Sequence, residues 1–173
     1  MSVTLAQLNV SSQAEFVAVL GGLFEHSPWV AEAAWNARPF KDAADLHAKM
    51  AAVMHAAPFA RILALLRAHP ELAGKAMVSK SLTADSTNEQ TRSGLTQCSP
   101  EEFARLTELN SAYNRKFGWP FILAVKHLDR ATIIKTFAER LENDAASEFS
   151  NGLKNIETIT RWRLDTLLDK PER

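Results

Sequence analysis

The order of hydrophobic and polar residues along this 173-residue chain predicts one helix after another. In most stretches apolar residues recur every three or four positions, which places them on one face of an α-helix. No stretch shows the sustained alternation of apolar and polar residues that is typical of a half-buried β-strand. We therefore predict an all-α fold of about eight or nine helices, built as a single domain over residues 1–173.

Capping signals divide this pattern into separate helices. Ser12 with Glu15, and Ser99 with Glu102, have the spacing of a capping box, in which each side chain bonds the backbone N–H of the other residue. Further helix starts are predicted at Ser27-Pro28, Asp42, Pro58 and Asp129. In the helix after Pro58, we expect an inward stripe made of Phe59, Ile62, Leu63 and Leu66.

One stretch departs from the helical pattern. Gly118 can end the preceding helix, and Pro120 disfavours more helix, so we predict a short extended segment near residues 119–125. Backbone groups in such a segment lack helical partners, and either another part of the chain or a bound substrate must supply them. We interpret the Trp119 and Phe121 side chains as part of the core.

Composition and charge exclude several classes of function. Hydrophobic residues make up 46% of the chain, and 20 basic residues balance 20 acidic ones. A binder of nucleic acid or of membrane surfaces usually has a basic excess, so we expect neither partner. No apolar run approaches the ~20 residues of a spanning helix, and we expect no secretory signal peptide. With Cys98 as the only cysteine, we expect a cytoplasmic protein without an internal disulfide.

A polar triplet, Ser86, Glu89 and Gln90, is the first candidate for chemistry. The spacing i, i+3, i+4 places a hydroxyl, a carboxylate and a carboxamide on one face of a helix. These groups suit a ligand with alternating N–H and C=O groups, such as a ureido compound. The alternative is an ordinary solvated helix start in which Ser86 is the cap.

His69 stands directly before Pro70, at the end of a predicted helix. One interpretation is a structural histidine that interacts with the last carbonyl groups of the helix. The other is a general acid or base, because an imidazole titrates near neutral pH and a following proline restricts its direction.

Arg163 lies in line with apolar residues of the last predicted helix, whereas Arg161 falls nearer the outer face. An arginine on an apolar stripe must extend to solvent, form an ion pair or face a cavity, and in a cavity it can hold an anion.

Metal and cofactor signatures are missing from the sequence. The five histidines form no metal-binding motif, and there is no glycine-rich phosphate loop or nucleophile elbow. The sequence alone therefore offers no motif for a metal or for a cofactor that carries a phosphate group.

Taken together and in this order, the motifs resemble one family, the 2-oxo-4-hydroxy-4-carboxy-5-ureidoimidazoline (OHCU) decarboxylases of urate breakdown. The matching stretches are "FEHSPWVAEAAW", "HPELAGK", "LTADSTNEQ", "LNSAYNRKFGWPFILAVK" and "ITRWRL", which span residues 24–164. The sequence departs from the expected pattern beside these motifs, at Asp85 and His127.

The resemblance implies an all-α lyase that forms (S)-allantoin by decarboxylation without a cofactor. It implies that His69 is catalytic, together with Glu89. It also implies a set of substrate-binding residues, namely Pro70, Ser86, Gln90, Phe121, Ile122, Leu123, Ala124, Val125 and Arg163. Two alternatives stay open, a non-catalytic helical binding module and a related lyase for another ureido or hydantoin acid. Exposed aliphatic residues on a helix are compatible with a homodimer.

Overall fold

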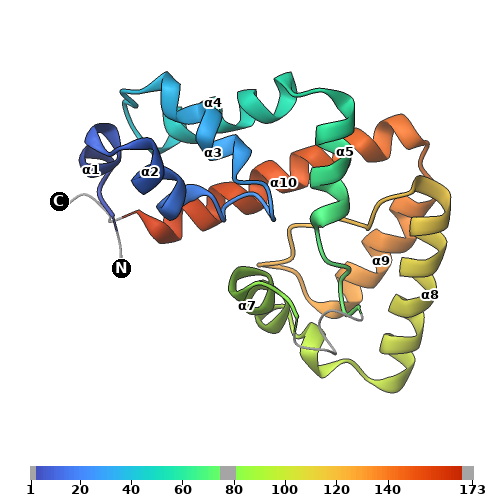
Figure 1. Ribbon diagram of the computed structural model, residues 1–173. Coiled ribbons are helices and arrows are strands. Elements are labelled where there is room, and N and C mark those ends of the chain that lie inside the picture. The colour runs from blue at the N-terminus through green and yellow to red at the C-terminus, as the bar shows by residue number, and fades with distance from the viewer. Residues whose placement is uncertain (1–2, 75–80, 169–173) are drawn as a thin grey trace. The chain divides into compact units, whose positions relative to one another are not determined.

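The computed structural model describes residues 3–74 and 81–168, and its regular structure is almost entirely α-helical (Figure 1). Within these ranges there are nine α-helices: α1 (Leu5–Val10), α2 (Gln13–Leu20), α3 (Trp29–Ala34), α4 (Ala43–Ala56), α5 (Phe59–Ala68), α7 (Ala84–Arg92), α8 (Pro100–Phe117), α9 (Arg130–Leu141) and α10 (Ala145–Leu167). Two short 3-10 helices, Trp35–Ala37 and Leu95–Gln97, complete them. The only β-type pairing in the described residues is one isolated bridge between Val3 and Leu168. The prediction of an all-α fold is confirmed.

The chain divides into two compact units. The first contains the described residues up to Leu65 together with those from Glu157 onward, and the second runs from Leu66 to Ile156. Helices α5 and α10 each pass from one unit into the other along their length. That residues 1–173 act as a single domain stays a prediction.

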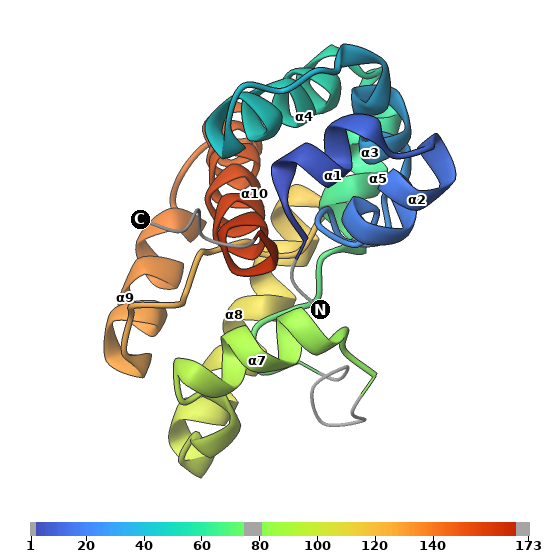
Figure 2. The same ribbon diagram turned by 90° about the vertical axis from the view of Figure 1, so that its left-hand side faces the viewer.

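The first unit is a group of short helices around an aliphatic and aromatic core. Helix α2 packs on α3, and α3 packs on α4. Figure 2 shows these three helices together with α1. The fully buried side chains of this core include Phe16, Leu20, Leu46, Met50 and Met54.

The second unit has an aromatic core, and its helices α8 and α9 pack together. The ring of Phe121 stacks on that of Phe137 at a centroid distance of 3.8 Å. Tyr113 meets both rings edge-on, at 5.3 and 5.7 Å. Phe121 is 1% exposed and Trp119 is 8% exposed, so the interpretation of both side chains as core is confirmed.

Most predicted helix ends are confirmed. Ser12 with Glu15 and Ser99 with Glu102 form complete capping boxes at the starts of α2 and α8. The other caps follow the prediction at Asp42, Asp129 and Gly118, the last in a left-handed conformation that suits glycine.

Three local predictions are wrong. Ser27 does not cap α3, because its hydroxyl donates to the carbonyl of Glu25, and Pro28 stands at the N-cap. Helix α7 begins before Ser86, since Thr83 is its cap and accepts the N–H of Ser86.

The inward stripe of α5 is also rotated from the predicted one. Phe59 is 64% exposed and Leu63 is half-buried, whereas Leu65 is fully buried beside Ile62 and Leu66. Phe59 is the first residue of the helix.

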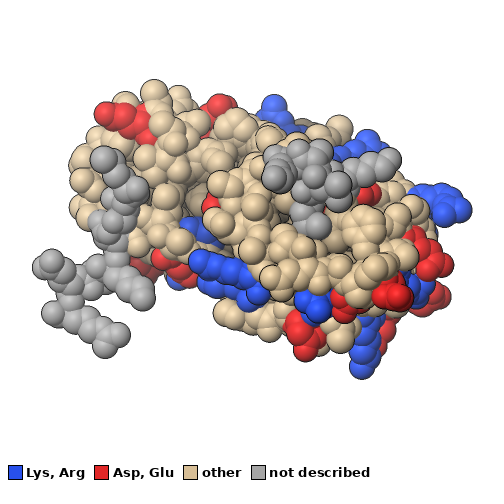
Figure 3. Space-filling view, turned by 90° about the horizontal axis from the view of Figure 1, so that it is seen from below, with Lys and Arg blue, Asp and Glu red and all other residues tan. Residues whose placement is uncertain are grey.

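No single helix in the described residues is long and apolar enough to cross a membrane. Helices α4 and α5 pass such a test only as a pair, by length and composition, and they meet at a bend of 116°. On the face of the molecule in Figure 3, basic and acidic side chains are interspersed and neither sign forms a continuous surface.

The capping box of α8 generates a stability prediction. Replacing Ser99 with Ala removes the acceptor for the Glu102 N–H, so Ser99→Ala should lower the free energy of unfolding by about 1 kcal/mol in urea denaturation. Thr107→Ala is the matched control in the middle of the same helix. Thr107 is exposed and bonds only back to the Phe103 carbonyl, so its replacement should leave stability unchanged or slightly higher. Equal losses in the two variants would contradict the capping assignment.

Candidate active site

His69 lies at the end of α5, in the second unit. Its N–H donates to the carbonyl of Leu66 at 3.3 Å, which closes the last turn of the helix, and the residue is only 7% exposed. Pro70 follows and is half-buried. The imidazole is therefore held inside the protein and does not extend into solvent at the helix end.

The turn after His69 is tied to α7 by the carboxamide of Gln90. The Gln90 Nε2 atom donates to the carbonyl of Glu71 at 3.2 Å, and Oε1 accepts the N–H of Ala73 at 2.9 Å. Both ends of the amide are therefore engaged with the backbone two and four residues beyond His69. The structure thus brings together two of the motifs that the sequence singled out, 69–74 and 86–90.

The polar triplet shares the inward face of α7. Ser86 and Gln90 are 4% and 3% exposed, and Glu89 is half-buried. Ser93, one turn further on, is also buried and donates its hydroxyl proton to the carbonyl of Gln90. The alternative of a fully solvated helix start does not hold for this face.

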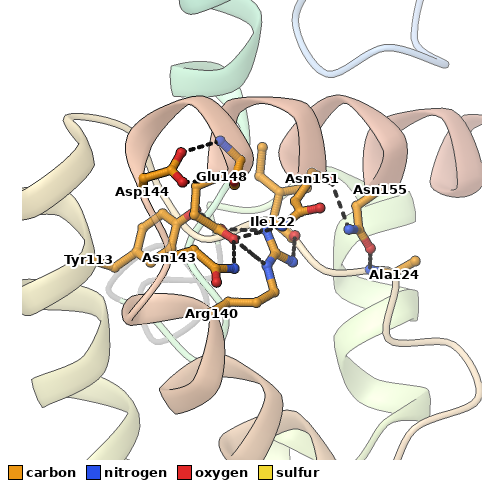
Figure 4. A network of polar contacts seen from close by, with 10 residues as sticks. Tyr113, Ile122, Ala124, Arg140, Asn143, Asp144, Glu148, Asn151 and Asn155 are labelled. Atoms are coloured by element: carbon orange, nitrogen blue, oxygen red, sulfur yellow. Dashed lines mark hydrogen bonds and ion pairs between the residues drawn. The ribbon is translucent and has the colours of Figure 1, made fainter.

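Residues 121–125 form neither helix nor strand, as the sequence predicts for this segment. Two of its backbone groups are bound by side chains of the same unit. The Ile122 carbonyl accepts from Arg140 Nη1 at 2.8 Å, and the Ala124 N–H donates to Asn155 Oδ1 at 2.9 Å (Figure 4). The chain itself therefore supplies these two partners, so any contact with a substrate must use other backbone groups of the segment.

A buried charged cluster holds this segment in place. Glu148 is fully buried and accepts hydrogen bonds from Arg140, with the shortest contact at 2.8 Å from Nη2. Asn143 and Asn151 each donate to the same carboxylate at 2.9 Å, and the hydroxyl of Tyr113 donates to it as well (Figure 4). The carboxylate is thus surrounded by donors, as a buried charge requires.

The cluster also sets the pKa values of its members. Burial raises the pKa of Glu148, but the hydrogen bonds from Arg140, Tyr113 and the two asparagines outweigh it, so the pKa lies below the ordinary value. The pKa of Tyr113 is raised, first by burial and then by its hydrogen bond to the Glu148 carboxylate. Glu148 is therefore ionised and Tyr113 protonated throughout the neutral range.

Arg163 lies in the first unit and forms a buried ion pair. Its Nη1 atom donates to Glu25 Oε2 at 2.9 Å and to the Leu23 carbonyl at 3.2 Å, and the residue is 7% exposed. Arg161 instead pairs with Asp165 near the surface, with 37% of its side chain exposed. The predicted orientations of the two arginines are confirmed.

Sequence reasoning missed the residues that hold the two irregular stretches. Arg140, Glu148 and Asn155 fix residues 121–125, and Asn110 and Asn114 contact the turn after His69. Helical spacing offers one signal for the first group, because Glu148, Asn151 and Asn155 follow one another at i, i+3 and i+7 in α10. A polar stripe of this kind inside an otherwise apolar helix face indicates a buried network.

Among the residues that the structure describes, no three His, Cys, Asp or Glu side chains are placed to hold a metal ion. The free Cys98 is half-buried, and its thiol donates to the Leu95 carbonyl.

Comparison with known proteins decides the family. A family model described as OHCU decarboxylase matches residues 9–165. The chain belongs to the OHCU decarboxylase family. The 2-oxo-4-hydroxy-4-carboxy-5-ureidoimidazoline decarboxylase of Mus musculus is 37% identical over 164 residues, covering 95% of this chain and 92% of the mouse protein. That of Amia calva is 35% identical over 167 residues, covering 96% of this chain and 95% of its own.

The solved structures agree on the fold of this OHCU decarboxylase family member. A crystal structure of (S)-allantoin synthase matches 98% of the chain, with a TM-score of 0.78 and 28% identity. The chain spans 56% of that longer protein.

The buried cluster generates a stability prediction for this family member. Glu148→Gln keeps the shape of the side chain but leaves the Arg140 guanidinium, whose side chain is only 11% exposed, without its counter-charge. We expect the free energy of unfolding to fall by about 3–5 kcal/mol at pH 7 in urea denaturation. Glu139→Gln in α9 is the control, because its pair with Lys135 is exposed and contributes less than about 0.5 kcal/mol. A loss in Glu148→Gln no larger than in the control would contradict the proposed importance of the cluster.

The lowered pKa of Glu148 predicts how this difference depends on pH. In the unfolded chain the carboxyl titrates near 4.5, and in the folded chain it titrates lower. Ionised Glu148 therefore stabilises the fold above pH 4.5, and this contribution is lost as the pH falls through the folded pKa. The gap in unfolding free energy between the wild type and Glu148→Gln should shrink when denaturation is repeated at decreasing pH from 7 to below 4. A gap that stays constant over this range would show that the carboxylate charge is not responsible.

Proposed function

We propose that this protein decarboxylates 2-oxo-4-hydroxy-4-carboxy-5-ureidoimidazoline to (S)-allantoin in urate breakdown, without a cofactor. Family membership over nearly the whole chain supports the reaction. The observation that carries the proposal is the pairing of the buried His69 turn with the inward polar face of α7 through Gln90. This pairing places an acid–base group and a set of hydrogen-bonding groups on adjoining elements of one unit.

The chemistry of the substrate defines what the site must do. The carbon that carries the carboxylate also carries a hydroxyl group and adjoins a C=N bond of the ring. When the bond to the carboxylate breaks, CO₂ leaves and the electron pair moves into the ring towards the nitrogen. A proton is then taken up at the neighbouring ring carbon, which becomes the stereocentre of allantoin. The hydroxyl carbon becomes a carbonyl, and the proton lost from its hydroxyl group passes to the ring nitrogen that received the electron pair. The protein must therefore stabilise charge on the ring and deliver one proton from one side.

We assign the proton transfer to His69. Glu89, half-buried on the inward face of α7, either orients the imidazole or accepts the ureido N–H groups. Ser86 binds the substrate from the same face, and Pro70 lines the site and restricts the direction of the imidazole. Gln90 binds the substrate through its second Nε2 hydrogen, since the first donates to the Glu71 carbonyl. Glu89 and Ser86 act here as an acceptor and a hydroxyl donor for a ligand rich in N–H and C=O groups.

Residues 121–125 supply backbone groups to the substrate. Because the Ile122 carbonyl and the Ala124 N–H are already bound by Arg140 and Asn155, the contacts come from the other groups. The other N–H groups of the segment, including that of Leu123, have no hydrogen-bond partner in the described part of the chain and can donate to a ring oxygen. A donor aimed at developing negative charge contributes about 3–4 kcal/mol to catalysis. Phe121 and Val125 take part through their backbone, since both side chains are buried in the core.

Arg163 is assigned to the substrate carboxylate or a ring carbonyl. This role rests on its match to the arginine of the family's last helix and on its burial. In the same proposal Glu25 holds the guanidinium in one direction through its 2.9 Å ion pair. We further propose that the protein acts in the cytoplasm on this small molecule, does not bind nucleic acid or membranes, and forms a homodimer.

Replacing His69 tests the proposed function. His69→Asn should lower the rate of (S)-allantoin formation at least 100-fold, because proton transfer by a positioned side chain contributes about 10²–10⁴-fold. The assay supplies freshly made intermediates of urate oxidation and follows optically active allantoin by circular dichroism, corrected for spontaneous decay. His55→Asn is the control, since His55 forms a partly exposed pair with Glu157 in the first unit. Near-normal turnover by a folded His69→Asn protein would rule out the assignment.

The two arginines of α10 provide a second test. Arg163→Lys keeps a cation beside Glu25 but loses the planar fork that binds a carboxylate in two places, so KM should rise about tenfold or more. Arg161→Lys retains an exposed pair with Asp165 and should leave KM unchanged. Equal effects in the two variants, measured by steady-state kinetics, would remove Arg163 from the substrate site.

A further inference from the structure

We propose that Asn110 and Asn114 of α8 are positioning residues for His69, acting together with Gln90 on the turn that follows it. The inference rests on the proposed function, because it assumes that His69 moves the proton. It adds two residues that touch no reacting atom and act through the backbone of residues 71–73.

Three side-chain amides hold this turn from two helices. The Asn110 Nδ2 atom donates to the Leu72 carbonyl at 2.9 Å, next to the Glu71 carbonyl that Gln90 holds. The Asn114 Nδ2 atom donates to the Glu71 carboxylate at 2.7 Å. The three residues that follow His69-Pro70 are therefore all held. Glu71 is bound through its carbonyl and its side chain, Leu72 through its carbonyl and Ala73 through its N–H.

The turn needs such restraint because its backbone is strained. Ala73 has a φ of 50°, a left-handed conformation that costs a residue with a Cβ about 1–2 kcal/mol. The following turn is also tight, since a Cβ added to Gly74 would lie 2.6 Å from the Cβ of Glu71. Without the amides, the chain beyond His69 would relax to other conformations. The imidazole would then no longer be held in a single orientation.

The spacing in α8 explains how one helix provides both contacts. Asn110 and Asn114 are four residues apart and therefore point the same way. The Asn114 amide also donates to the Asn110 carbonyl at 2.9 Å, so both of its hydrogens are used.

Asn110 is a poor choice for packing alone. It is 4% exposed, and its Oδ1 atom has no hydrogen-bond partner among the described residues. Burying an acceptor in this way costs about 1–3 kcal/mol, which a leucine at the same place would avoid. The amide is retained for the bond that it donates to the turn.

The test is a double-mutant cycle on Glu71 and Asn114. Asn114→Ala removes the contact while improving the helix propensity of α8, so the helix itself is not weakened. We expect kcat to fall about tenfold in Asn114→Ala and in Glu71→Ala, with KM within about threefold of the wild type. The kcat of the double variant should lie within about threefold of that of either single variant, because both substitutions remove the same contact. Glu71→Gln keeps an acceptor for Asn114 and should restore kcat to within about threefold of the wild type.

Each measurement is made per folded molecule, with the folded fraction taken from circular dichroism. Glu108→Ala, which removes an exposed pair with Arg105 on the same helix, is the matched control and should leave kcat unchanged. The inference is overturned if Asn114→Ala keeps kcat within twofold, if the two single effects multiply in the double variant, or if Glu71→Gln is as slow as Glu71→Ala. It is also overturned if Asn114→Ala does not fold, since the contact would then be structural. If Glu71→Ala does not fold, the other two variants still test the inference. Asn114→Ala must then lower kcat about tenfold, and Glu71→Gln must keep kcat within about threefold of the wild type.

The result is separable from the test of the proposed function. An active His69→Asn protein would remove the catalytic assignment itself. An inactive His69→Asn protein together with a fully active Asn114→Ala protein would leave that assignment in place and remove only the positioning role.

Discussion

The buried ion pair between Arg140 and Glu148 is the interaction on which the second unit depends. A fully buried carboxylate is tolerated only if donors surround it, and here they come from α8, α10 and the residues next to Arg140. The same guanidinium lies 4.5 Å over the ring of Phe121 and binds the Ile122 carbonyl. One cation therefore joins the polar network, the aromatic core and the irregular segment 121–125.

The unit holds its two non-helical stretches by different means. Segment 121–125 is held by a charge and by the amide of Asn155, and its apolar side chains enter the core on the other side. The turn after His69 is held by side-chain amides and contributes Leu72 and Ala73 to the buried set. In both stretches helical side chains replace the backbone partners that a strand or helix would have had, which leaves irregular backbone ordered and directed inward.

Local chemistry made most of the fold predictable, because helix starts and stops depend on a few neighbouring residues. The caps at Ser12, Ser99 and Asp129 and the end at Gly118 needed no tertiary information. Neighbouring residues could not predict which face of α5 is buried. The choice between Leu63 and Leu65 depends on which other parts of the fold cover the helix. The partners of residues 121–125 were only partly visible, because the spacing of Glu148 and Asn155 in α10 marks a polar stripe but does not show what it contacts. Arg140 and Glu148 lie on opposite sides of a helix break, so no periodicity connects them.

The position of Tyr113 has a spectroscopic consequence. It is the only tyrosine in the chain, and its hydroxyl lies inside the second unit against Glu148. Because its pKa is raised in the folded protein, the phenol stays protonated at an alkaline pH where a tyrosine in an unfolded chain ionises. Tyrosinate absorbance at such a pH therefore arises only when this unit opens. The protein carries its own optical reporter for the opening of the unit that contains His69, with no contribution from any other residue of the same type.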